Sequence, residues 1–177
     1  MIIVLNATPL IYVTKIGFSW VFEKLGELGV KIIVPETVYQ EVVTIGKEKG
    51  FSDAIIVDEL VKKNVFEIKK CLTKNAVKRL LETTFGREKL IHSGEIEVLA
   101  LAMELQGIAI IDEKNARKIA EAMGITVHGT MYLFIILYRH RIISKDELVA
   151  IFDELVSHGW RVSVEDYIKI KRKIELL

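Results

Sequence analysis

The chain has 177 residues, of which 51% are hydrophobic and 28% are charged, and its formal net charge is +1. This composition is that of one ordered globular domain, because a disordered chain would be poorer in apolar residues. The near-neutral charge argues against binding nucleic acid by bulk positive charge. Any such contact must depend on local basic clusters, each of which is more often a solvated helix face. Five clusters occur, at Lys69–Lys70, Lys74–Arg79, Lys114–Lys118, Arg139–Arg141 and Lys169–Lys173.

Three features predict a cytoplasmic protein without membrane association. No apolar run approaches the roughly 20 residues that a membrane span needs. The N-terminal residues lack the basic region and the cleavage site of a secretory signal. The single cysteine, Cys71, cannot form an internal disulfide, which agrees with a reducing compartment.

The first predicted element is a central strand. Ile2–Leu5 is an uninterrupted apolar run, which is typical of a strand buried on both faces of a parallel sheet. Polar residues follow at once, with Thr8 suited to cap a helix and Pro9 suited to its first position. Asn6 therefore stands where a central strand ends, and this edge of an open α/β sheet is where ligands bind.

Strands and helices then alternate along the chain. Further strands are predicted at Val30–Val34, Val65–Ile68, Ile108–Ile111 and Ile125–Val127. Helices are predicted at Pro9–Gly17, Ser19–Gly29, Glu36–Ile45, Asp53–Lys63, Thr73–Glu82, His92–Gln106 and Ala116–Met123, with a flexible break at Gly46–Gly50 and a loop at Thr83–Lys89. This alternation predicts an α/β domain with a parallel sheet and helices on both faces.

After Gly129 the pattern is only helical, at Met131–Arg139, Lys145–Val156 and Glu165–Glu175, with Ser144 and Ser163 as capping residues. We therefore predict an α/β domain over residues 1–130 and a helical C-terminal extension over residues 131–177. The extension is expected to pack on the domain, or alternatively to form a dimer surface.

Four polar side chains are candidates for a shared site: Asn6, Glu41, Glu95 and Asp112. Each also has an ordinary structural role available. Asn6 could form an Asx turn, Glu41 could face solvent, Glu95 could stabilise a helix N-terminus, and Asp112 could cap a helix. If the first and fourth strands are neighbours, however, Asn6 and Asp112 lie side by side at one sheet edge. Acids gathered in this way repel one another unless a divalent cation lies between them.

Helical geometry separates Glu95 from Glu97, because residues two apart differ by about 200° around an α-helix. The neighbours of Glu95 one turn away include Ile91 and Leu99, so Glu95 borders the buried face and needs a cation or a metal as partner. Glu97 is expected to face solvent. Other chemistries have little support, since the four histidines lack zinc spacing, no Gly-rich phosphate loop occurs, and nothing near Cys71 would activate it.

Three segments resemble the motifs of PIN-domain nucleases. IIVLNATPLIYVTKIG resembles the first motif, an apolar run followed by Asp, any residue, Ser or Thr, and Pro-Leu-Ile. IIVPETVYQEVV resembles the second, with Glu41 at the acidic position. HSGEIEVLALAMELQGIAIIDEKNARKIAEAMGI resembles the remaining two, with Glu95 and Asp112 at the acidic positions. The likeness covers residues 1–130 and extends to the helical tail, as in a prokaryotic branch related to toxin–antitoxin ribonucleases.

The resemblance implies a three-layer α/β/α sandwich with a central parallel sheet of four or five strands. It also implies metal-dependent hydrolysis of RNA phosphodiester bonds, with Glu41, Glu95 and Asp112 as catalytic residues. The acidic residues would hold Mg²⁺ or Mn²⁺, and the metal would lower the pKa of a bound water that attacks in line. Many relatives are toxins neutralised by a small antitoxin, and PIN-like proteins commonly form homodimers. RNA, an antitoxin protein and a second copy are therefore the expected partners.

Position 6 departs from the family pattern, which has Asp there. Asn6 keeps an oxygen for a metal but has one negative charge fewer and cannot act as a base. Glu113 could be a further metal ligand that replaces part of this charge, because Asp112 and Glu113 both fit the fourth acidic position. Thr8 matches the Ser or Thr of the first motif and could orient a ligand or a water.

Two functions therefore stay open. The first is a PIN-type endoribonuclease, and the second is a degenerate PIN-like module that binds RNA or a protein partner without cutting. A third interpretation, an unrelated phosphate-binding or receiver-like domain, is disfavoured because the acids are spread over four segments.

Overall fold

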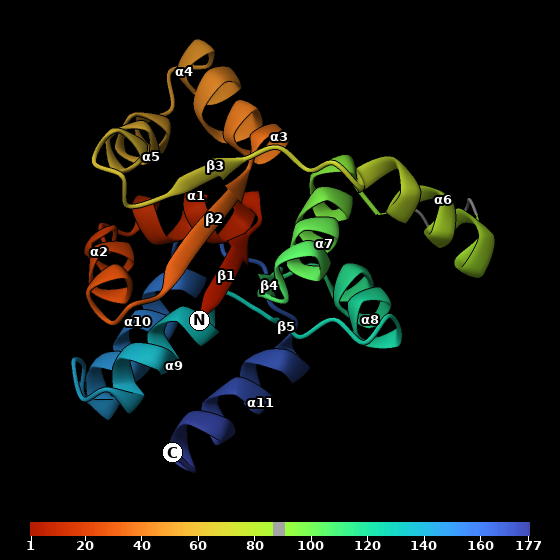
Figure 1. The fold of residues 1–177 in the computed structure, drawn as a ribbon. Helices are drawn as coiled ribbons and strands as arrows, with labels where there is room; N and C mark the ends of the chain where they lie inside the picture. Colours follow the sequence, from red (N-terminus) through yellow and green to blue (C-terminus); the bar gives the residue numbers. More distant parts are fainter. Residues whose placement is uncertain (87–90) are drawn as a thin grey trace.

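The computed structural model describes residues 1–86 and 91–177. Its centre is one sheet of five parallel strands in the order β3-β2-β1-β4-β5 (Figure 1). The strands are β1 (Ile2–Leu5), β2 (Lys31–Pro35), β3 (Glu67–Lys69), β4 (Ile108–Ile110) and β5 (Val127–His128). The predicted parallel sheet is confirmed, and the first strand pairs with the fourth, which was the condition for Asn6 and Asp112 to share one sheet edge.

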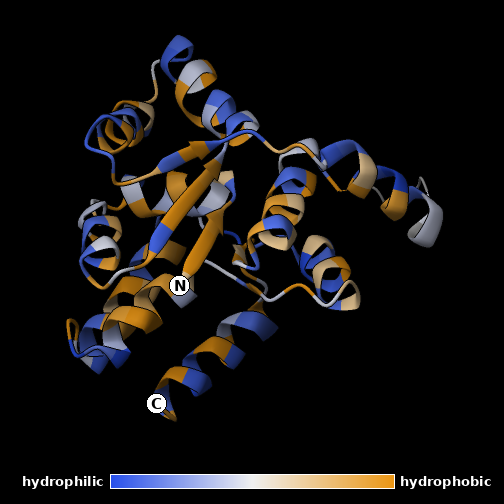
Figure 2. Ribbon diagram, viewed as in Figure 1, coloured by the Kyte–Doolittle hydropathy of each residue, from blue (hydrophilic) through white to orange (hydrophobic). Residues whose placement is uncertain are grey.

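Strand β1 lies at the middle of the sheet, as its apolar run predicts. Ile3, Val4 and Leu5 are each 0% exposed. Ile3 pairs with Ile32 of β2 on one side and with Ile108 of β4 on the other. Figure 2 shows β1 and most of β2 as hydrophobic, while the outer helices alternate between hydrophobic and hydrophilic residues.

Helices cover both faces of the sheet and form an α/β/α sandwich (Figure 1). One side carries α1 (Ala7–Lys15), α2 (Trp20–Glu27) and α5 (Ser52–Lys62), and the other carries α7 (Ser93–Leu105), which contacts β1, β2 and β4, and α8 (Lys114–Ala122), which contacts β5. This division follows from right-handed crossovers. The chain moves outward from β1 to β3 and then reverses direction to reach β4 and β5, so the later helices fall on the opposite face.

The helix after β2 differs from the prediction in two respects. The predicted single helix is α3 (Glu36–Tyr39) followed by the π-helix η1 (Gln40–Ile45), and it continues into α4 (Gly46–Glu48). The predicted break at Gly46–Gly50 is therefore wrong for residues 46–48. A Cβ at Gly46 would lie 2.8 Å from the Ala54 Cβ. Gly46 therefore allows close packing against α5 and does not interrupt the helix.

Two helix boundaries also differ from the prediction. Helix α1 begins at Ala7, with Asn6 rather than Thr8 in the N-cap position. Helix α6 (Lys74–Phe85) extends past the predicted end at Glu82. The predicted loop at Thr83–Lys89 is therefore helical at its start, and its last residues, 87–89, lie outside the described residues.

The C-terminal helices are α9 (Met131–Arg139), α10 (Lys145–Ser157) and α11 (Val164–Glu175). Helix α9 packs on α2, and α10 packs on both α9 and α11. The predicted caps are present, because the Ser144 and Ser163 hydroxyls accept hydrogen bonds from the N–H groups of Glu147 (3.2 Å) and Asp166 (3.1 Å). Among the described helices, none combines the length and apolar character that crossing a membrane requires.

Candidate active site

The candidate site lies at the carboxyl edge of the sheet, where β1 leads into α1. The Asn6 N–H donates a hydrogen bond to the Ile110 carbonyl oxygen (3.1 Å), so the pairing of β1 with β4 extends one residue beyond the strand. Asn6 is 8% exposed. Within the described residues its side chain caps no amide of α1. The Asn6 amide group is thus held at the sheet edge and is available to another partner.

The Asn6 and Glu41 side chains both approach the same space beside Gly94. The position that a Cβ at Gly94 would occupy lies 3.7 Å from Asn6 Oδ1 and 3.7 Å from Glu41 Oε2. The two oxygens are therefore no farther apart than twice that distance. Glu41 itself lies in η1 and is exposed. A π-helical segment within an α-helix is frequently found at functional sites. Here the π-helix η1 contains Glu41.

Glu95 follows Gly94 in the first turn of α7 and is 5% exposed. Burial raises the pKa of the Glu95 carboxyl, and the negative charges of Glu113 and Glu41 raise it further, while the His92 N–H that donates to Glu95 Oε2 (2.8 Å) lowers it. The charges of Glu41 and Glu113 thus both act on the Glu95 carboxyl at this edge of the sheet. A cation placed among them would relieve that repulsion.

The alternation of an extended chain separates Asp112 from Glu113. The register of β1 and β4 places Asn6 beside Ile111. Because successive side chains of an extended segment point to opposite faces, Asp112 projects away from the Asn6 side and Glu113 returns to it.

The contacts of the two acids agree with this separation. Asp112 Oδ1 accepts a hydrogen bond from the Thr130 N–H (2.7 Å), and Asp112 Oδ2 accepts from the Thr130 hydroxyl (2.6 Å) and from Trp160 Nε1 (2.9 Å). Glu113 instead caps α8 by accepting from the Ala116 N–H (2.5 Å), and its charge acts on Glu95. Asp112 therefore joins the sheet edge to the C-terminal helices, while Glu113 lies with the other acids.

Thr8 lies half-buried in the first turn of α1, two residues after Asn6. Glu97 is 3% exposed, so the prediction that it faces solvent is wrong. It accepts a hydrogen bond from the Thr37 hydroxyl and forms an ion pair with Lys74 (3.7 Å). Helix α7 packs against the sheet on one side and against α3 and α6 on others, and this leaves no solvent face at position 97.

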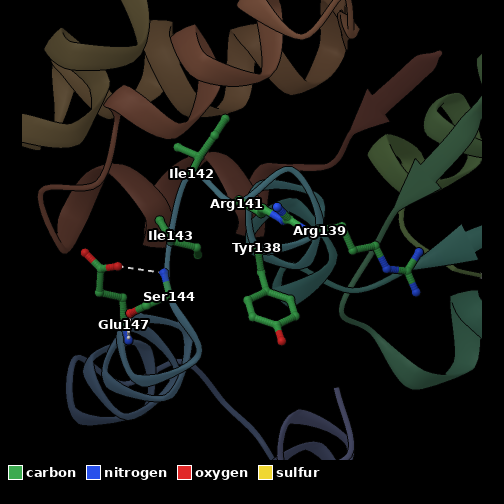
Figure 3. A pocket seen from close by; sticks show the side chains of 7 residues that line it. All are labelled: Tyr138, Arg139, Arg141, Ile142, Ile143, Ser144 and Glu147. Carbon is green, nitrogen blue, oxygen red and sulfur yellow. Dashed lines mark hydrogen bonds between the residues drawn. The ribbon is translucent and has the colours of Figure 1, made fainter.

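A separate hollow of about 590 Å³ lies where α9 turns into α10 (Figure 3). The Glu147 carboxylate there accepts a hydrogen bond from the Ser144 N–H (2.7 Å) and so completes the cap of α10. The guanidinium of Arg139 extends away from Ser144 and Glu147 in this view. The one acid of this hollow is thus used in capping a helix, and the acids of the sheet edge remain the candidates for chemistry.

Residues 2–176 match a family model, DUF3368, which is described as a PIN domain. The chain belongs to the PIN-domain family. The match extends over the helical C-terminal residues as well as the α/β unit, and the predicted PIN-like fold is confirmed. A search of curated proteins found no match.

The donor set of this PIN domain suits a hard divalent cation, the class of metal that PIN domains generally use. All the side-chain donors at the edge are oxygens, from Asn6, Glu41, Glu95 and Glu113, as Mg²⁺ prefers. Among residues 1–86 and 91–177, no three His, Cys, Asp or Glu side chains are grouped closely enough to hold a metal ion. Asn6, the residue that replaces an acid here, adds a further oxygen ligand that is not one of these four residue types. Mg²⁺ keeps several waters and needs only one or two carboxylates, so the set fits in a hydrated mode.

Three residues of this site were not predicted from the sequence: Gly94, Thr130 and Trp160. Gly94 leaves open the space between Asn6 and Glu41, and its position before Glu95 was the available signal. Thr130, which is 0% exposed, and Trp160 hold Asp112, and no local pattern connects residues so distant along the chain.

Proposed function

We propose that this PIN domain is a divalent-metal-dependent endoribonuclease whose activity is weakened by Asn6. The observation that carries the proposal is the approach of Asn6 Oδ1 and Glu41 Oε2 to the same space beside Gly94, with the buried Glu95 as the next residue. Like charges gathered on a partly buried edge repel one another and destabilise the fold, and a bound cation would offset this repulsion. The family match supplies the nuclease-like context.

Asn6, Glu41 and Glu95 would hold Mg²⁺ or Mn²⁺, with Glu113 adding negative charge nearby. The bound ion would supply a water of lowered pKa as nucleophile. Asn6 contributes a neutral oxygen and cannot accept a proton. Glu41 is exposed, so its carboxylate can orient the attacking water and exchange protons with solvent. Thr8, in the adjacent first turn, would orient a ligand or a water.

Glu113 is our choice for the fourth acidic position. Its charge acts on Glu95, and the extended chain returns it to the Asn6 side. Asp112 has both oxygens engaged by Thr130 and Trp160, which supports an anchoring role for it. The catalytic role that the family resemblance assigns to Asp112 stays a prediction, tested by the Asp112 variant described below.

Cleavage of a fluorogenic RNA tests the proposal. The protein is assayed with Mg²⁺ or Mn²⁺ and with chelator, and Glu41→Gln is compared with Glu48→Gln, a matched change at an exposed glutamate of α4. We expect metal-dependent cleavage, reduced by roughly 10²-fold in Glu41→Gln, as for the loss of one preorganised electrostatic group. Equal activity in the two variants, or full activity in chelator, would overturn the proposal.

A second candidate function is a degenerate PIN module that binds RNA or a protein without cutting. Asn6 and the lack of a three-acid cluster among the described residues favour it. Asn6→Asp separates the two functions, because cleavage that appears only in the variant identifies the natural protein as the degenerate form. A toxin role with an antitoxin partner, and a homodimer, are further proposals, for which light scattering of the protein alone and with a co-expressed partner is the test.

A further inference from the structure

A groove of about 810 Å³ lies between α8, β5, α9 and α11, beside the edge strand of the sheet. Three of the five basic clusters in the sequence contribute cations to it, although they are far apart along the chain. These cations are Lys114, Arg117, Lys118, Arg139, Lys169 and Lys173. The fold therefore collects positive charge that the near-neutral net charge conceals.

The cations come from three helices that face one another. Lys114, Arg117 and Lys118 share one face of α8 because they are three and four residues apart. The Lys114 ammonium pairs with Asp166 of α11 (3.4 Å), which joins the two walls of the groove. Burial is the main cause that lowers the pKa of His128, and the charges of Arg139 in α9 and Lys173 in α11 lower it further. Both cations therefore lie near β5.

Most of this charge is not neutralised. Glu121 and Asp166 are the acids among the described residues that line the groove. Within the described part of the chain, Lys114 is the groove cation that forms an ion pair. Lys118, Lys169 and Lys173 are exposed. A concave surface with excess cations and few acids attracts a polyanion strongly.

A stacked aromatic pair lies in the same groove. The rings of His128 and Tyr132 are parallel within 22°, with centroids 3.9 Å apart. Both side chains are half-buried, and Ile135 and Ile170 continue the apolar lining. Basic side chains around an aromatic and apolar floor form the arrangement with which proteins bind single-stranded nucleic acid, because phosphates meet the cations and bases stack on the rings.

The groove adjoins the acidic edge of the sheet. Lys114, at one end of the lining, directly follows Glu113, and Trp160, also in the lining, donates its hydrogen bond to Asp112. An RNA strand lying in the groove would thus pass beside Lys114, one residue from Glu113.

We propose that this groove binds single-stranded RNA and presents it to the acidic edge. The proposal rests on the proposed nuclease function, for which it supplies the path of the substrate. The exposed lysines contact phosphates, and Tyr132 stacks with a base. An acidic peptide would suit the cations equally well, but it would make no use of the stacked ring pair, which favours the nucleotide.

Binding without cleavage tests the groove by itself. Fluorescence anisotropy is measured with a short labelled oligo-uridylate in chelator, for the wild type and for Lys118→Glu/Lys173→Glu. The matched control is Lys49→Glu/Lys70→Glu, which changes two exposed lysines outside the groove. We expect affinity to fall by about tenfold or more in the groove variant only, and the slope of log K against log salt to shrink by about 1.4, two single-strand contacts at 0.7 each.

Tyr132→Leu tests the aromatic contact separately. It keeps an apolar side chain on α9 and should weaken binding by about tenfold without changing the salt slope, because stacking releases no counterions. Equal losses in the groove and control variants would overturn the proposal, as would an unchanged affinity in the groove variant. Poly-glutamate that binds as tightly as the oligonucleotide, with no effect of Tyr132→Leu, would also overturn it in favour of an acidic protein partner.

These measurements distinguish a failure of the groove proposal from a failure of the nuclease proposal. Glu41→Gln should bind the oligonucleotide as the wild type does and lose cleavage, because it changes the acidic edge alone. The groove variant should lose binding in chelator, where no cleavage occurs. An inactive protein that retains groove-dependent binding would overturn only the nuclease proposal.

Discussion

Replacing Asn6 with Asp adds a fourth carboxyl group to an edge that already holds Glu41, Glu95 and Glu113. The new carboxylate would lie where Asn6 Oδ1 now lies, no more than twice 3.7 Å from Glu41 Oε2. Two unit charges at about 7 Å repel by about 1–2 kcal/mol at an effective dielectric constant of about 20–40. Because Glu41 is exposed, we expect the lower end, about 1 kcal/mol. The thermal midpoint in chelator should therefore fall by about 2–4 °C for a domain of this size.

A divalent cation should reverse the direction of this change in stability. The same charge that destabilises the chelated protein strengthens metal binding, and a metal that binds only the folded state stabilises it by mass action. Adding millimolar Mn²⁺ should therefore raise the midpoint of Asn6→Asp more than that of the wild type. RNA cleavage should increase in parallel. The assay is differential scanning fluorimetry with and without metal, with Glu48→Asp as the control. An Asn6→Asp variant that matches the wild type in chelator and gains nothing from metal would refute the reasoning.

Three further changes test other parts of the site. For Glu95→Gln, the folded-state pKa of the carboxyl is raised above its ordinary 4.5, so wild-type stability falls as pH rises through that window. The advantage of the variant in urea unfolding should grow from about pH 4 to neutrality. Asp112→Ala should lower the free energy of unfolding by about 2–4 kcal/mol, because the buried Thr130 N–H loses its acceptor. Gly94→Leu should fill the space between Asn6 and Glu41 and abolish the metal-induced rise in midpoint.

Each of these predictions has a result that contradicts it. A pH-independent difference for Glu95→Gln would mean that neither burial nor the neighbouring acids raise the pKa of the Glu95 carboxyl. An Asp112→Ala variant of wild-type stability that no longer binds metal would make Asp112 a ligand rather than an anchor. Unchanged metal stabilisation in Gly94→Leu would place the ion elsewhere, and Gly94→Ala, whose methyl group makes only ordinary contacts, is the control for the loss of glycine.

The strands and their parallel arrangement were accessible from local pattern, while their order came from the structure. Ile2–Leu5 is apolar at every position, and this suffices to place it at the centre of a parallel sheet. The alternation of strands and helices then leaves few topologies, because crossovers are right-handed. Asn6 at a ligand edge follows from the same pattern, since it is the first polar residue after the central strand.

The remaining details depend on contacts that no local pattern encodes. The π-helix η1 around Glu41 has the sequence QEVVTI, which contains neither Gly nor Pro. Nothing in this sequence predicts a change of helix type. Glu97 could not be placed by periodicity because α7 is covered on several sides. The different roles of Asp112 and Glu113 depend on the register of β4 against β1, which is a tertiary property.

Calorimetric titration with Mn²⁺ tests the central claim most directly. The wild type is compared with Glu41→Gln/Glu95→Gln, which removes the charge of the carboxylate beside Gly94 and the charge of Glu95, on which Glu41 acts. The account predicts one site of millimolar or tighter affinity in the wild type and none in the double variant. A wild type without a site at millimolar Mn²⁺, or a double variant that binds Mn²⁺ as the wild type does, would contradict the account.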